Sequence, residues 1–299
     1  MINKKIFVGL ALSCISSFSL AQQEEGQINP NSLLNIPRYE QLYKVKVWRT
    51  LDLNEKQNKG FFAKGNEITG LIIRAVKSGE LTDIYKSDSV ISKSSKEQFF
   101  KDMVSQAGAT LPNWEPAKDF YQGDQVTFNG KNYEATVDSK GKNPTTSANE
   151  WQVTTAGQAT EFLPSEISKM TLVEDVIFDK RRSRLYYDML AVGFSAFDQN
   201  TGTYKPLGWF KYKDLEKLFR NHVKDAVWFN RYNTAENKNY ADAFLLRLFH
   251  GAIYKVENPD DDSIVDTYRA NGRPYKESIW ATEWEEMKMM EREHNLWEY

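Results

Sequence analysis

Residues that could carry catalysis are present in this chain, but their spacing does not form a catalytic or metal-binding set. The three histidines, His222, His250 and His294, are far apart in the sequence, and no H-E-x-x-H or C-x-x-C spacing occurs. Residues 193–197 read G-F-S-A-F and lack the second glycine of the G-x-S-x-G nucleophile elbow. The sequence therefore predicts a protein that is not an enzyme, with no catalytic residue, no metal site and no cofactor.

Composition and charge exclude a further class of partner. The chain has 299 residues and a formal net charge of −2. Because it has no overall basic charge with which to neutralise phosphates, we expect no nucleic-acid partner. The acidic run at residues 260–262 lacks the alternating oxygen ligands and the glycine of a calcium loop, so we expect a solvated loop there.

The last twenty residues carry the strongest pattern. On a helix, five side chains would share one side at steps of three, four or seven residues, here called the aromatic stripe: Trp280, Trp284, Met287, His294 and Trp297. Two interpretations stay open. The stripe faces the protein's own core, as such stripes usually do, or it is an interface for a partner or another copy, where Trp and Met are enriched. The candidate partner-binding residues of this stretch are Trp280, Trp284, Trp297 and Tyr299.

A cluster of basic residues is the second candidate. Lys180, Arg181 and Arg182 follow one another, with Arg184 close behind, between two expected strands. Clustered charge on a turn could bind an acidic partner or anionic lipid head groups, and Arg181 and Arg182 are the candidate partner-binding residues here. The alternative is a solvated hairpin turn without a partner.

The N-terminus has the pattern of a secretory signal peptide over residues 1–21. Two lysines precede the apolar run 6–20, and a small-residue cleavage site ends at Ala21, after which we predict cleavage. The single cysteine, Cys14, lies inside this segment, so the exported chain would have no disulfide. The polar stretch 22–42 is predicted to be a flexible leader.

The elements that must position these candidates predict an α+β fold, an antiparallel sheet with packed helices, over residues 43–110 and 160–299. Alternating patterns predict strands at 45–51, 81–85, 173–178, 185–197 and 204–212. Helical patterns predict one helix between a cap at Asn66 and a stop at Gly79, a second after Ser94 or Ser95, a third at 214–222, and a long, mostly buried one at 240–255.

Residues 111–159 differ in composition from the rest. They are rich in Gly, Asn, Thr and Ser, with short alternating runs and a tight hairpin signal at Asn129-Gly130. We predict that they form a small β module inserted between the two halves of the larger domain.

Six ordered blocks of the sequence carry a resemblance: 47–53, 174–183, 229–231, 242–249, 253–258 and the closing E-H-N-L-W-E-Y of 293–299. Together they resemble the GldN family, also called PorN, of the type IX secretion and gliding-motility machinery of Bacteroidota. The resemblance covers most of the chain outside the insert and the signal peptide.

This resemblance implies a periplasmic, non-enzymatic subunit that is peripherally associated with the outer membrane. It implies an outer-membrane lipoprotein partner of the GldK or PorK kind, assembly into a ring, and a link to an inner-membrane motor protein of the GldM or PorM kind. The family offers no catalytic residues to carry over.

A set of residues, mostly aromatic, glycine or small apolar, has a characteristic spacing in the insert: Trp114, Tyr121, Gly123, Asp124, Val126, Phe128, Gly130, Lys131, Tyr133, Ala135, Gly141, Pro144 and Trp151. This spacing resembles a different family, the small chitin- and cellulose-binding modules of carbohydrate-binding families 5 and 12. Those modules usually place two adjacent exposed aromatics just after the position of Ala135, where this chain has Val137 and Asp138. The resemblance implies the alternative function of a periplasmic glycan-binding protein, acting on peptidoglycan or a chitin-like chain. The candidate glycan-binding residues are Trp114, Tyr121, Tyr133 and Trp151.

Overall fold

The structure is a computed structural model, and it describes residues 28–106, 111–154, 157 and 159–297. The predicted signal peptide with its cleavage point after Ala21, the leader up to residue 27, and the candidate Tyr299 lie outside the described residues. Within them, no helix combines the length and the apolar character needed to cross a membrane.

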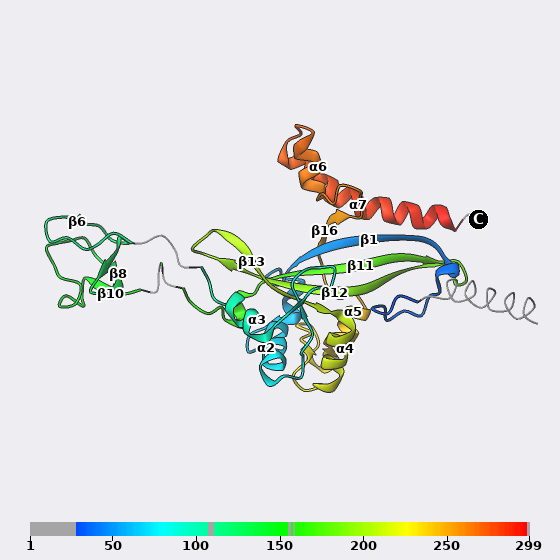
Figure 1. Cartoon of the computed structure of the whole chain (residues 1–299), viewed down its shortest axis with the longest axis horizontal. Coiled ribbons are helices and arrows are strands. Elements are labelled where there is room, and N and C mark those ends of the chain that lie inside the picture. Colours follow the sequence, from blue (N-terminus) through cyan, green and yellow to red (C-terminus); the bar gives the residue numbers. More distant parts are fainter. Residues whose placement is uncertain (1–27, 107–110, 155–156, 158, 298–299) are drawn as a thin grey trace, which may run out of the picture.

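A seven-stranded antiparallel sheet forms the centre of the fold, in the order β16-β1-β11-β12-β13-β4-β5 (Figure 1). Helices pack on it, so the predicted α+β class is confirmed. The strands are β1 (Gln41–Asp52), β4 (Ile84–Tyr85), β5 (Lys93–Ser94), β11 (Lys169–Asp179), β12 (Arg184–Asp198), β13 (Thr203–Lys211) and β16 (Ala252–Val256).

The central strands are long because their apolar side chains are covered on both faces. Every residue of β11 from Met170 to Asp179 is buried, which is the pattern of a strand between two packed layers. The predicted strands at 173–178 and 185–197 are thus confirmed, and both extend further. A tight turn joins β11 to β12 through Ser183, whose φ is +48°.

The helices α2 (Ile68–Ser78), α3 (Lys96–Asp102), α4 (Tyr212–Asn221) and α5 (Tyr240–Leu245) cover one face of the sheet (Figure 1). Two predicted helix ends are confirmed: Gly79 ends α2 with a φ of +83°, and the Ser95 hydroxyl accepts a hydrogen bond from the Gln98 N–H at the start of α3. The N-cap of α2 is Glu67 rather than the predicted Asn66.

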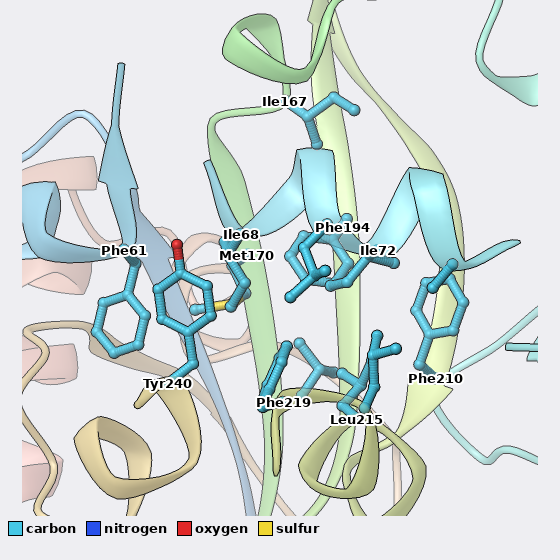
Figure 2. Packing of buried hydrophobic residues seen from close by; sticks show 14 of the residues in the cluster. Phe61, Ile68, Ile72, Ile167, Met170, Phe194, Phe210, Leu215, Phe219 and Tyr240 are labelled. Carbon is cyan, nitrogen blue, oxygen red and sulfur yellow. The ribbon is translucent and has the colours of Figure 1, made fainter. Parts of the chain in front are cut away.

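Large apolar side chains from these helices and the strands make the main hydrophobic core. Figure 2 shows how the side chains of α2 and α4 meet those of the strands. Fully or almost fully buried members include Phe61, Ile68, Ile72, Met170, Phe210, Leu215, Phe219 and Tyr240.

The prediction of one long helix over 240–255 is wrong. Helix α5 ends at Leu245, Arg247 takes a left-handed φ of +53°, and the chain continues into the edge strand β16. At Gly251 a Cβ would lie 2.7 Å from the Leu51 side chain, so the backbone there approaches β1 closely. Pairing with β1, which satisfies the backbone groups of 252–256, replaces the last part of the expected helix.

The other face of the sheet carries α6 (Ile264–Ala270) and the terminal helix α7 (Tyr275–Leu296), which follow β16 (Figure 1). A separate apolar cluster lies beneath α7 and joins it to β1, β11, β12 and β16. The face that positions the C-terminal stretch is therefore covered by fewer helices than the opposite face.

Short elements complete the core domain. Residues 164–166 form a single 3-10 turn. The remaining short elements are η1 (Arg38–Glu40), η2 (Asn58–Phe61), η3 (Pro164–Glu166), η4 (Thr234–Glu236), β2 (Phe62–Ala63) with β3 (Asn66–Glu67), and β14 (Val227–Trp228) with β15 (Lys238–Asn239).

Residues 111–154 hold a small three-stranded sheet with a cluster of their own. The predicted hairpin turn is confirmed, with φ values of +49° at Asn129 and +75° at Gly130, as a tight two-residue turn requires. The strands are β6 (Asp119–Phe120) with β9 (Ser139–Lys140), and β7 (Gln125–Phe128), β8 (Lys131–Ala135) and β10 (Trp151–Val153).

Candidate functional site

One narrow face of the terminal helix α7 lies against the sheet. Ser278, Ala281 and Met289 are buried, and Met289 and Leu296 pack into the apolar cluster of the strands beneath. These four positions lie on one side of the helix because their spacing follows its period of 3.6 residues. The face of α7 that lies on the sheet thus carries Ser, Ala, Met and Leu side chains and none of the indoles.

The aromatic stripe lies on the opposite side of α7 and is exposed. The exposed fractions are 55% for Trp280, 50% for Trp284, 53% for Met287 and 63% for Trp297, and His294 is exposed as well. The interpretation of the stripe as a core-facing surface is therefore wrong.

Polar contacts with β1 fix how α7 is rotated on the sheet. Glu286 makes an ion pair with Arg49, and the Arg292 guanidinium donates to the Tyr43 hydroxyl at 2.5 Å and lies over its ring. Because position 286 meets 49 and position 292 meets 43, α7 runs antiparallel to β1. These contacts hold the aromatic stripe toward solvent.

A buried ionic group lies directly beneath α7. Glu174 is fully buried and accepts from Arg49 Nε at 3.2 Å and from an Arg247 guanidinium nitrogen at 2.5 Å. Burial alone would raise the pKa of Glu174, but Arg247 and Arg49 outweigh burial and hold that pKa below its usual value. Two cations face one buried carboxylate, and Glu286 supplies the second negative charge when α7 is in place.

The basic turn predicted from the sequence joins β11 to β12. The buried Asp179 carboxylate accepts from the Arg181 and Arg182 N–H groups at 2.8 and 3.2 Å and from the Arg182 guanidinium at 2.5 Å. These bonds hold the pKa of Asp179 below its usual value even though its burial would raise it. The turn is therefore fixed from inside, with the Arg181 and Arg182 side chains exposed.

Sequence reasoning missed a pair of buried aspartates. Asp175 on β11 and Asp188 on β12 are paired in register, and both are buried. Asp175 makes an ion pair with Lys44 at 2.7 Å, and Asp188 accepts from the Leu33 N–H at 3.3 Å. Among the described atoms, Asp175 Oδ1 and Asp188 Oδ2 have no hydrogen-bond partner. The signal available in the sequence was Asp188, an aspartate within the otherwise mostly apolar predicted strand 185–197.

The four candidate glycan-binding residues of the insert have different environments. Tyr133 and Trp151 are buried in the cluster of the small sheet, where they cannot stack on a sugar ring. Trp114 is half-buried against the Phe128 ring, edge to face at 5.2 Å. Tyr121 is 64% exposed. The structure therefore does not bring these four aromatics together into one exposed platform.

Two of the three histidines make surface contacts with glutamates. His222 Nε2 lies 2.7 Å from Glu80 and His250 Nδ1 lies 3.0 Å from Glu55. Across 28–106, 111–154 and 159–297, no three His, Cys, Asp or Glu side chains are grouped in a way that could hold a metal ion.

The geometry defines a class of protein: an α+β protein whose candidate site is an exposed aromatic face of a helix. The family model described as gliding motility associated protein GldN matches residues 36–298, and the chain belongs to this family. Membership implies a component of the gliding-motility and type IX secretion machinery. A search of the curated proteins found no match.

Proposed function

We propose that this protein is a non-enzymatic structural subunit of the type IX secretion and gliding machinery, acting in the periplasm at the outer membrane. In this proposal it forms a ring complex with an outer-membrane lipoprotein of the GldK or PorK kind and contacts a motor-linked protein of the GldM or PorM kind. Family membership supports the assignment to the machinery.

The exposed aromatic stripe of α7 is the observation that carries the docking part of this proposal. Trp and Met are enriched where protein interfaces are buried, and truncating a central Trp costs about 2 kcal/mol or more of binding free energy. Trp280, Trp284 and Met287 are each at least half exposed on a helix whose rotation is fixed. A preorganised apolar face of this kind loses little conformational entropy when a partner covers it.

The test is copurification from cell envelopes after crosslinking. In a chain with Trp280→Ala and Trp284→Ala, we expect the lipoprotein partner to be lost while the melting temperature of the isolated chain stays the same, because both indoles are exposed. The matched control is Tyr232→Ala, which removes an aromatic that is 85% exposed and lies between β14 and β15. Full retention of the partner by the double variant would count against the stripe as the docking surface.

Glycan binding through residues 111–159 is the second candidate, and the exposed ring of Tyr121 is the observation in its favour. A pull-down of the full chain on chitin and on peptidoglycan, with release by soluble sugar, distinguishes it. Retention that is lost in Tyr121→Ala would support glycan binding, and passage of the chain through both matrices would remove it.

A further inference from the structure

Three segments that are far apart in the sequence meet at one end of the sheet. Residues 38–42 contain η1 and the start of β1, residues 179–184 form the basic turn, and α7 ends above them (Figure 1). The Lys180 N–H donates to the Glu40 carbonyl at 2.8 Å, which ties the first two segments together. Leu296 packs into the cluster that contains Phe178 and Leu185, the residues just outside the turn.

Two of these three segments are basic although the chain is slightly acidic, while the last turns of α7 contain Glu291 and Glu293 beside Arg292. The stretches 38–42 and 179–184 contain five cations and two carboxylates, a net charge of +3, against −2 for the whole chain. One of the two carboxylates, Asp179, is buried inside the turn. The cations, all with exposed side chains, are Arg38, Lys180, Arg181, Arg182 and Arg184.

Exposed apolar and aromatic side chains lie among these cations. Tyr39 is 65% exposed and Leu42 is 52% exposed, and both belong to the segment tied to the turn. Trp297 is exposed at the end of α7, next to the packed Leu296. Tyr and Trp have an apolar body with a polar tip and favour the boundary between lipid and water.

We propose that this basic end, made of residues 38–42, 179–184 and Trp297, docks on an anionic lipid surface. The cations would lie at the level of the head groups, each contributing through its attraction to negative lipid charge. Tyr39, Leu42 and Trp297 would enter the boundary region, as in proteins that lie on a membrane without crossing it. An acidic protein would also match the cations, and the binding test below distinguishes it from a lipid surface.

The proposal is independent of the ring complex, since it needs only the chain and a lipid surface. The experiment is co-sedimentation of the mature chain, purified from cells, with lipid vesicles. The vesicles contain equal amounts of phosphatidylcholine and phosphatidylglycerol. Vesicles of phosphatidylcholine alone are the comparison. We expect binding to the anionic vesicles that weakens steeply between low salt and about 0.5 M salt, because screening shortens the reach of the charges.

Two variants separate this surface from general electrostatics. The change Lys180→Glu, Arg181→Glu and Arg184→Glu leaves the Arg182–Asp179 pair in place and should weaken binding about tenfold or more. The matched control, Lys56→Glu, Lys101→Glu and Lys224→Glu, alters the net charge equally at exposed positions elsewhere and should bind like the natural chain.

The apolar part has its own variant, Tyr39→Ser with Leu42→Ser, which should weaken binding several-fold at unchanged charge. Three results would overturn the proposal: no binding to anionic vesicles at low salt, equal losses in the charge variant and its control, or binding to soluble polyglutamate but not to vesicles. The last result would assign the basic end to an acidic protein instead.

Discussion

At the scale of single residues, the central strands contain ionisable side chains in opposite electrostatic situations. Glu174 lies between two arginines, which stabilise its charge. Its neighbour Asp175 points to the other side of the strand and lies beside Asp188. Burial, with a smaller contribution from Asp175, raises the pKa of Asp188 to about 6, although the neighbouring Ser32 side chain, the Leu33 N–H and Lys44 act in the other direction. The pKa values of Glu174 and Asp188 are therefore shifted in opposite directions.

The pH dependence of Asp188 yields a prediction. An unfolded Asp has a pKa of about 3.9, so the folded chain binds the extra proton between about pH 4 and pH 6. The contribution of Asp188 to stability therefore falls as pH rises through this window, and its ionised form is unfavourable above it. We expect Asp188→Asn to raise the free energy of unfolding by about 1 to 3 kcal/mol at pH 7.5 and to have little effect at pH 4.

Urea unfolding of the natural chain and the variant at both pH values measures this difference. Asp260→Asn, at an exposed position, is the control and should change stability equally little at both. A constant difference between Asp188→Asn and the natural chain across the pH range would contradict the role of Asp188.

At the scale of elements, α7 has two different faces with different tasks. The face with Ser278, Ala281 and Met289 packs on the sheet, and the aromatic stripe faces away from it. Met289 and Met287 are two residues apart on the same helix, with exposed fractions of 7% and 53%. This pair allows the same chemical change to be made on each face.

We predict that Met289→Ala lowers the free energy of unfolding by about 2 kcal/mol, because it removes a buried side chain and leaves a cavity. Met287→Ala should change it by less than about 0.5 kcal/mol, because the side chain is exposed in both the folded and unfolded chain. Thermal and urea unfolding of the two variants measure the difference. Equal losses would mean that α7 is rotated differently on the sheet.

The elements also show how far the sequence predicts this fold. Three local signals are confirmed: Ser95 caps α3, Gly79 ends α2, and Asn129-Gly130 makes the hairpin turn. These signals depend on neighbouring residues alone. The helix over 240–255 was predicted wrongly because the pairing of β16 with β1 is a contact between distant segments. Periodicity does not distinguish a buried strand from part of a helix in a short apolar run.

The candidate site was predicted in part. Periodicity predicts the helix and the side of it that carries the indoles, but large apolar side chains usually indicate the buried side. The rotation of α7 on the sheet depends on contacts between distant residues, Glu286 with Arg49 and Arg292 with Tyr43. No local sequence pattern contains these contacts. The buried aspartate pair was missed for the same reason, since its register comes from the pairing of β11 with β12.

At the scale of the whole molecule, the insert leaves and returns at neighbouring positions. Val104 bridges to Glu161, the Ser105 N–H donates to the Thr160 carbonyl at 2.8 Å, and the Phe162 N–H donates to the Met103 carbonyl at 2.8 Å. The small sheet between them has its own cluster of buried side chains. Both observations support the predicted division of the chain into a core domain and an inserted module.

We predict that replacing residues 107–158 by a short Gly-Ser linker leaves the core domain folded. The two ends are already side by side, so a short linker closes the gap at little entropic cost. Circular dichroism and thermal unfolding of the shortened chain test this. We expect its melting temperature to be close to that of the core domain in the full chain. Loss of cooperative unfolding would show that the module and the core form one unit.

The antiparallel course of α7 along β1 also determines how the molecule would respond to mechanical load. Tension applied to the terminal helix passes through Arg49 and Tyr43 into β1, whose hydrogen-bonded register with β11 extends from Gln41 to Asp52. A pull along a strand loads many backbone hydrogen bonds in shear at the same time, whereas a pull across a sheet edge would open them one after another. The sheet therefore resists extension when a partner pulls on α7. We expect the contacts between α7 and the sheet to break before the strands separate.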